Sequence, residues 1–135
     1  MSALRSLDQL RAASAYAAIE TAPKKAAEMA SRLPAMLQIN GLLATWAFLL
    51  AQEGKGNPTP VAALLGYLRS LPHLAVPTGN AGAVFLHWVG GPTGAGSGIN
   101  GSLLRALTVE ALAWSVWLKR AAEARGVVAD GNTHG

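Results

Sequence analysis

The sequence predicts an all-α fold, a compact bundle of five to six helices with a Gly/Pro-rich insertion before the last helix. Ala and Leu supply 47 of the 135 residues, 27 and 20 respectively, whereas Val and Ile are scarce, and this composition favours packed helices over a sheet. Apolar residues also recur at helical spacing in segments bounded by proline or glycine. With 51% hydrophobic and 13% charged residues, the chain has more apolar surface than a monomer needs.

One domain over residues 1–126 suits this length, and we expect a flexible tail over residues 127–135. The first ten residues contain Arg5 and Asp8 and lack the apolar run of a secretory signal. With no cysteine, the chain has neither disulfides nor thiolate ligands. We therefore expect a cytoplasmic protein.

Two helices are predicted before Leu33. Residues 2 to about 21 are good helix formers, and proline at position 23 opens a short second helix over residues 24–32 that ends at Leu33 and Pro34. The apolar side predicted for the first helix consists of Leu4, Leu7, Leu10, Ala13 and Ala17.

Twenty uncharged residues lie between Arg32 and Glu53, a length that could cross a bilayer. Polar residues and a proline leave a clean apolar stretch of only about ten residues, which favours a buried helix of a soluble protein over a membrane span. A membrane-associated protein built on residues 33–52 is the least favoured alternative. The predicted apolar face is Met36, Asn40, Leu43, Ala47 and Leu50, and Gln38, Thr45 and Gln52 lie opposite.

The dipeptide Asn40–Gly41 allows two interpretations. Either the helix breaks there, as this dipeptide often does in turns, or it continues and the glycine admits a close neighbour. We favour the continuous helix, with the Asn40 amide hydrogen-bonded in the core.

The second half of the chain contains two clear helices. Thr59 and Pro60 open one that ends near Leu71, with an apolar face of Val61, Leu64, Leu65 and Leu68. Residues 72–101 hold eight of the fifteen glycines, and their apolar island, residues 83–89, fits a short helix or a buried strand. The last helix starts at Asn100 or Ser102 and ends at Gly126. Its core face is Leu107, Ala111, Trp114, Leu118 and Ala121.

The last helix is apolar on much of its remaining surface as well. We expect one side to face the core and a second side, with Leu112, Val116 and Trp117, to meet another subunit. The polar strip between them includes Lys119 and Glu123, which are spaced for an ion pair. For Glu110, a salt bridge to a neighbouring helix is favoured over a subunit contact.

No motif in the sequence supports catalysis, so we expect no catalytic residue, no metal site, no cofactor and no small-molecule substrate. Gly96, Gly98 and Gly101 match G-x-G-x-x-G, but the strand–helix unit of a nucleotide site is missing, which favours a glycine-rich loop. None of the three histidines has a second histidine or a carboxylate at helical spacing.

The basic residues are the remaining functional candidates. The net charge is +4, spread along the chain, so binding to a polyanion requires that the cations converge on one face of the fold. The candidates are Arg11, Lys24, Lys25, Arg32, Lys119 and Arg120, with Arg69 and Arg105 weaker.

Three blocks of sequence are similar to a known family: QLRAASAYAAIE at residues 9–20, RLPAMLQINGLLATWAFLL at 32–50 and LTVEALAWSVWLKRAAEA at 107–124. The chain resembles the small helical subunit of the type III-B CRISPR RAMP module, the Cmr effector complex. The Gly/Pro-rich region at 72–101 has no counterpart in this resemblance, so no function is transferred to it.

The resemblance implies an all-α subunit without enzymatic activity that is repeated beside the backbone RAMP subunits of the complex. Those larger subunits hold the guide RNA and cut target RNA. The implied partners are these subunits, other copies of the chain, and the guide and target RNA, along which the six stronger basic candidates would lie. The alternative from the residues alone is a homo-oligomeric helical adaptor that binds only proteins.

Overall fold

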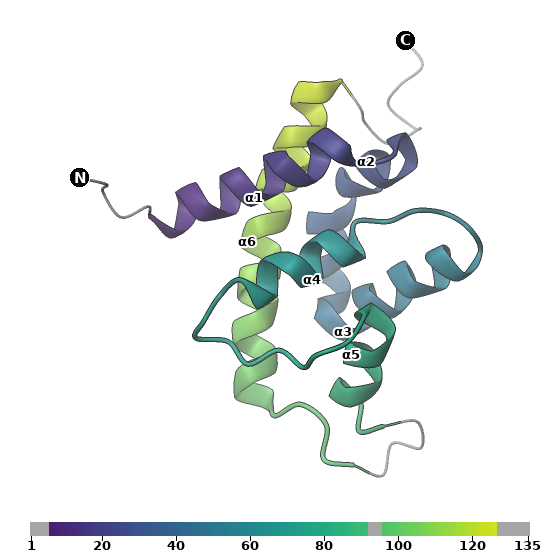
Figure 1. Ribbon diagram of the computed structural model, residues 1–135, viewed down its shortest axis with the longest axis vertical. Helices are drawn as coiled ribbons and strands as arrows, with labels where there is room; N and C mark the ends of the chain where they lie inside the picture. The colour runs from purple at the N-terminus through teal and green to yellow at the C-terminus, as the bar shows by residue number, and fades with distance from the viewer. Residues whose placement is uncertain (1–5, 92–95, 127–135) are drawn as a thin grey trace.

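The computed structural model describes residues 6–91 and 96–126, which form six α-helices (Figure 1). In chain order these are α1 (Leu7–Thr21), α2 (Lys24–Ala30), α3 (Leu33–Gly54), α4 (Val61–Arg69), α5 (Ala81–Trp88) and α6 (Gly101–Arg125). The predicted all-α class is confirmed. The predicted tail over residues 127–135 lies outside the described residues.

Local sequence signals set the ends of the first and last helices. Ser6 caps α1 because its hydroxyl accepts from the Gln9 N–H at 3.1 Å, and the Gln9 side chain accepts from the Ser6 N–H at 2.8 Å. Asn100 caps α6 because its side-chain oxygen accepts from the Leu103 N–H at 2.8 Å, and Gly126 ends α6 with φ 87°. Both predicted ends of α6 are thus confirmed.

The core is built around α6, against which α1, α2, α3 and α4 all pack (Figure 1). All five residues of its predicted core face are buried. The four predicted apolar residues of α4 are buried too. Burial of these two faces stabilises the fold at roughly 25 cal/mol per Å² of apolar surface.

The apolar face predicted for α1 was wrong for its described residues, and Leu4 lies outside them. Leu7 and Leu10 are 37% and 41% exposed, and the buried residues of α1 are Ala15 and Ile19. The reason is that α1 turns its more polar side towards α6, where Arg11 and Ser14 find hydrogen-bonding partners. Satisfied polar contacts therefore determine the orientation of α1, and its leucines remain at the surface.

The continuous helix predicted through Gly41 was also wrong. Gly41 has φ 81° and ψ 177°, a conformation that only glycine adopts readily, and it breaks α3 into two segments. The break shifts the helical phase, so Thr45, Trp46 and Leu49 are buried while Asn40 is exposed. α3 passes a test of length and hydropathy for a membrane span, but neither segment alone has the about 20 residues needed.

The apolar island at 83–89 belongs to a helix. Asn80 caps α5, and Trp88 of α5 meets Trp46 of α3 edge to face, with ring centroids 4.9 Å apart. The glycine-rich loop returns to the end of α5, where Ile99 donates to the Trp88 carbonyl at 2.9 Å. A Cβ at Gly98 would lie 2.7 Å from that oxygen, so this glycine permits a close backbone approach.

Candidate nucleic-acid interface

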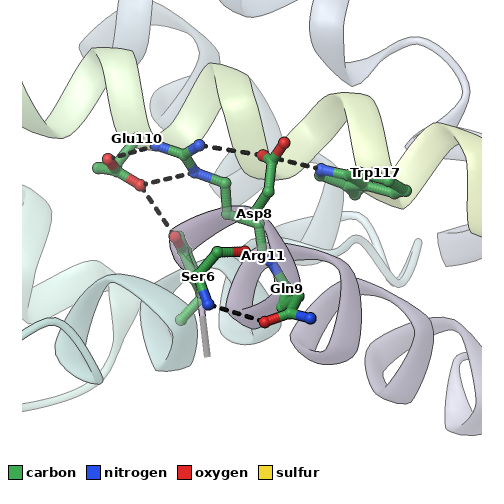
Figure 2. Close-up of polar contacts among 7 residues, drawn as sticks. Ser6, Asp8, Gln9, Arg11, Glu110 and Trp117 are labelled. Atoms are coloured by element: carbon green, nitrogen blue, oxygen red, sulfur yellow. Dashed lines mark hydrogen bonds and ion pairs between the residues drawn. The ribbon is translucent and has the colours of Figure 1, made fainter. Parts of the chain in front are cut away.

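A buried polar network joins α1, α4 and α6. Figure 2 shows the guanidinium of Arg11 between the carboxylates of Glu110 and Asp8, with the indole of Trp117 beyond Asp8. Arg11 donates to Glu110 at 2.8 Å and 3.2 Å, a bidentate pair, and the Tyr67 hydroxyl donates to the same carboxylate at 2.9 Å. The salt bridge favoured for Glu110 is confirmed.

The network alters the pKa values of its members. Burial alone would raise the pKa of Glu110, but hydrogen bonds from Arg11 and Tyr67 outweigh burial and hold the pKa below its ordinary value. Burial, followed by the Glu110 carboxylate, raises the pKa of Tyr67, and the bond to Glu110 raises that of Arg11. At neutral pH the carboxylate is ionised, and the phenol and guanidinium are protonated.

Arg11 therefore has a structural role. Its side chain is only 16% exposed, and its charge is balanced by two carboxylates. The Arg11 guanidinium is therefore engaged within the fold rather than presented at the surface. Sequence reasoning missed Tyr67, whose hydroxyl is placed by the helical register of α4, because no pattern linked it to Glu110, 43 residues away.

Further polar contacts fasten α1 to α6. The indole N–H of Trp114 donates to the Ser14 hydroxyl at 3.0 Å. At the other end of α1, the Arg125 guanidinium donates to the carbonyls of Ile19 and Ala22 at 2.9 Å and 2.8 Å. Arg125 thus adds a donor to two carbonyls at the end of α1, of which the Ile19 carbonyl also accepts from the Ala22 N–H.

The other five basic candidates belong to α2, to the turn after it and to the C-terminal part of α6, and α2 packs against α6. Lys24, Lys25, Arg32, Lys119 and Arg120 are all exposed. Arg120 stacks over the Trp117 ring, 4.8 Å from its centroid, which orders the guanidinium while leaving it in solvent. We refer to these five residues as the basic end.

The two weaker basic candidates lie elsewhere. Arg69 donates to the carbonyls of Pro77 and Gly79, so it holds the loop between α4 and α5. Arg105 is exposed near the start of α6, far along the helix from Lys119. Although both residues are described, Lys119 and Glu123 do not form the ion pair that their spacing predicts, as is common for solvated side chains.

The three predicted subunit-contact residues are all half-buried, and Leu112 and Trp117 pack partly against the core. Trp117 packs against the core and donates to Asp8 at 3.4 Å, so α1 already covers part of it. Leu112 and Val116 are half-buried, and Val109, which sequence reasoning missed, is 59% exposed. By helical spacing Val109, Leu112 and Val116 lie on one side of α6, which we call the valine stripe.

The remaining sequence candidates lie apart. His73 and His87 are exposed, and His134 lies outside the described residues. Within residues 6–91 and 96–126 no three His, Asp or Glu side chains are grouped as metal ligands. Of the G-x-G-x-x-G glycines, Gly96 and Gly98 permit the close approach of the loop to the end of α5 and the turn after it, whereas Gly101 begins α6 and a Cβ there would meet nothing within 4 Å.

The fold and the site define a small all-α protein whose candidate functional residues are surface cations and apolar side chains rather than a constellation of reactive groups. A family model described as CRISPR-associated protein (Cas_Cmr5) matches residues 7–76, which include all of α1 to α4. The match spans more than half of the chain, which therefore belongs to this family of small CRISPR-associated subunits of the type III-B Cmr complex. No curated protein and no solved structure matched in the corresponding comparisons.

Proposed function

We propose that this chain is a non-catalytic structural subunit that packs beside the backbone RAMP subunits and other copies of itself. Its basic end follows the path of the guide and target RNA. In this role it contributes to RNA-guided antiviral defence in the cytoplasm, and it needs no cofactor or small-molecule substrate. The family match supports membership in the complex.

The observation that carries the RNA role is that the five exposed cations belong to α2, the turn after it and the C-terminal part of α6, and that α2 and α6 contact each other. Four of the five belong to segments far apart in the chain, Lys24 and Lys25 on α2 and Lys119 and Arg120 on α6. Exposed cations on two helices that contact each other can neutralise phosphates of one RNA strand and release condensed counterions, whatever the base sequence. Base pairing between guide and target would supply the sequence specificity.

The valine stripe supports the scaffolding role. Val109, Leu112 and Val116 present apolar surface along one side of the longest helix, where burial against another subunit is favourable. The same stripe would also serve the alternative, an adaptor that binds only proteins. RNA capture separates the two functions.

The test is charge reversal in the assembled complex. Lys24→Glu, Lys25→Glu and Arg32→Glu together should leave helicity and assembly intact, weaken target RNA capture and reduce the slope of log affinity against log salt by about 2. Arg105→Glu is the control, because it reverses an exposed cation away from the basic end. Unchanged capture by the triple variant would reject the RNA role and leave the protein-only adaptor.

A further inference from the structure

A hollow of about 190 Å³ lies between α2 and the segment in which α3 ends. One wall comes from α2 and the turn after it, where Lys25, Glu28, Met29 and Arg32 follow one another at spacings that place them on one helix side. Two of these residues belong to the basic end. This wall therefore brings two cations, one carboxylate and one apolar side chain to a single concave surface.

The opposite wall carries a pair of side-chain amides and a proline. Asn57 donates from Nδ2 to Gln52 Oε1 at 3.0 Å, and its backbone N–H donates to the Gln52 carbonyl, also at 3.0 Å. Pro58 follows and completes the lining. These bonds fix the two amides against each other, so their remaining hydrogen-bonding groups are held in a set arrangement.

The amide pair keeps one donor group and one acceptor free. After the mutual bond, Gln52 retains its N–H groups and Asn57 its carbonyl oxygen, and neither has another hydrogen-bonding partner in the described part of the chain. Exchanging oxygen and nitrogen in both amides would again leave one donor and one acceptor. Adjacent donors and acceptors match the edge of a nucleobase.

The rest of the hollow suits the other parts of a nucleotide. Met29 and Pro58 offer apolar atoms to the face of a base, and Lys25 and Arg32 offer positive charge to its phosphate. The Glu28 carboxylate opposes a phosphate but accepts hydrogen bonds from ribose hydroxyls. A bare phosphate would use the cations alone and leave the amide pair and the apolar atoms unused.

We infer that this hollow holds one unpaired nucleotide of RNA, with its base edge on the Gln52–Asn57 amide pair and its phosphate beside Lys25 and Arg32. The inference rests on the proposed RNA role and adds a contact to a base. The base contact selects unpaired nucleotides over paired ones, because pairing occupies the same edge.

The test titrates the full-length chain with uridine 5′-monophosphate, adenosine 5′-monophosphate and ribose 5-phosphate, observed through the side-chain amide resonances of Gln52 and Asn57. At least one nucleotide should bind about fivefold or more tightly than ribose 5-phosphate, the discrimination expected of a paired amide contact. Gln52→Ala should remove that difference and retain ribose 5-phosphate binding, whereas Gln38→Ala, at an exposed glutamine of α3, should change neither. Equal binding of all three probes to the unaltered protein, or unmoved amide resonances, would overturn the inference.

A second comparison separates this inference from the proposed function. A short oligouridylate and the same oligomer with abasic positions are bound to the assembled complex at several salt concentrations. We expect the abasic oligomer to bind more weakly. Equal, salt-sensitive binding of both would reject the base contact and keep the RNA role, whereas salt-insensitive or absent binding of both would reject the RNA role itself.

Discussion

The ring of Tyr67 stacks on that of Trp114, with centroids 5.8 Å apart and planes 14° from parallel, while its hydroxyl donates to Glu110 one turn earlier on α6. One side chain of α4 thus makes an apolar and a polar contact with the same helix. The hydroxyl, the carboxylate and the Arg11 guanidinium form one network that closes the gap between α1, α4 and α6.

Replacing Arg11 alone should lower the free energy of unfolding more than replacing Arg11, Glu110 and Tyr67 together with apolar residues. Arg11→Ala leaves the Glu110 carboxylate partly buried without its cation, and we expect a loss of about 3 kcal/mol in the free energy of unfolding. The combination Arg11→Met, Glu110→Leu and Tyr67→Phe should recover most of that loss. Denaturant unfolding measures both, and a triple variant less stable than Arg11→Ala would contradict this account.

The network should also make the protein sensitive to acid. Because the pKa of Glu110 is lower in the folded than in the unfolded state, the unfolded chain binds the proton more readily. The stabilisation is present above the unfolded pKa of about 4.3 and is lost as pH falls through the folded value. Thermal midpoints from pH 7 to pH 3 should therefore fall less steeply for Glu110→Gln than for the unaltered protein, although the variant is less stable at pH 7.

Gly41 should tolerate no other residue without loss. Gly41→Ala places a Cβ in open space, so any penalty comes from the backbone conformation, and we expect about 1–3 kcal/mol of destabilisation. Gly66→Ala is the matched control, because that Cβ also meets nothing within 4 Å and the residue lies within α4. There we expect stabilisation of about 0.5–1 kcal/mol. Chemical denaturation measures the free energy of unfolding of each variant. If both variants were more stable than the unaltered protein, α3 would be unbroken at Gly41.

Thr45 lies in α3 shortly after the break at Gly41, and replacing it should stabilise the protein. Thr45 is 1% exposed, and its hydroxyl has no hydrogen-bonding partner among the described residues. Thr45→Val replaces an unsatisfied hydroxyl with a methyl group, which should stabilise the protein by about 1 kcal/mol. Thr108→Val is the control, because its hydroxyl donates to the Leu104 carbonyl at 2.7 Å, and that variant should gain nothing comparable in its unfolding temperature.

The sequence was most informative where one helix face meets one core. The faces of α4 and α6 could be predicted because their apolar residues keep a single 3.6-residue phase from cap to cap. Helical periodicity failed to predict the buried side of α3, since a helical wheel assumes unbroken phase and Gly41 resets it. It failed in α1 because polar residues that bond to α6 outweighed the leucines in orienting that helix.

The residues of the candidate site also differed in how far local sequence could predict their surroundings. Exposed cations such as Lys24 and Arg32 could be selected from the sequence because charge is solvated by default. Arg11 is a basic residue like these, but it lies in a bidentate pair with a residue 99 positions away, which no local pattern reveals. The hollow beside α2 was missed because its two walls come from segments separated in the chain.

The position of α6 at the centre of the fold also constrains how the chain is made. The ribosome synthesises α1 to α5 before α6. Until α6 has been made, α1, α2, α3 and α4 therefore lack the helix against which they pack. Native structure must then form mainly after α6 has emerged from the ribosome, and until that moment the nascent chain presents apolar side chains that chaperones recognise.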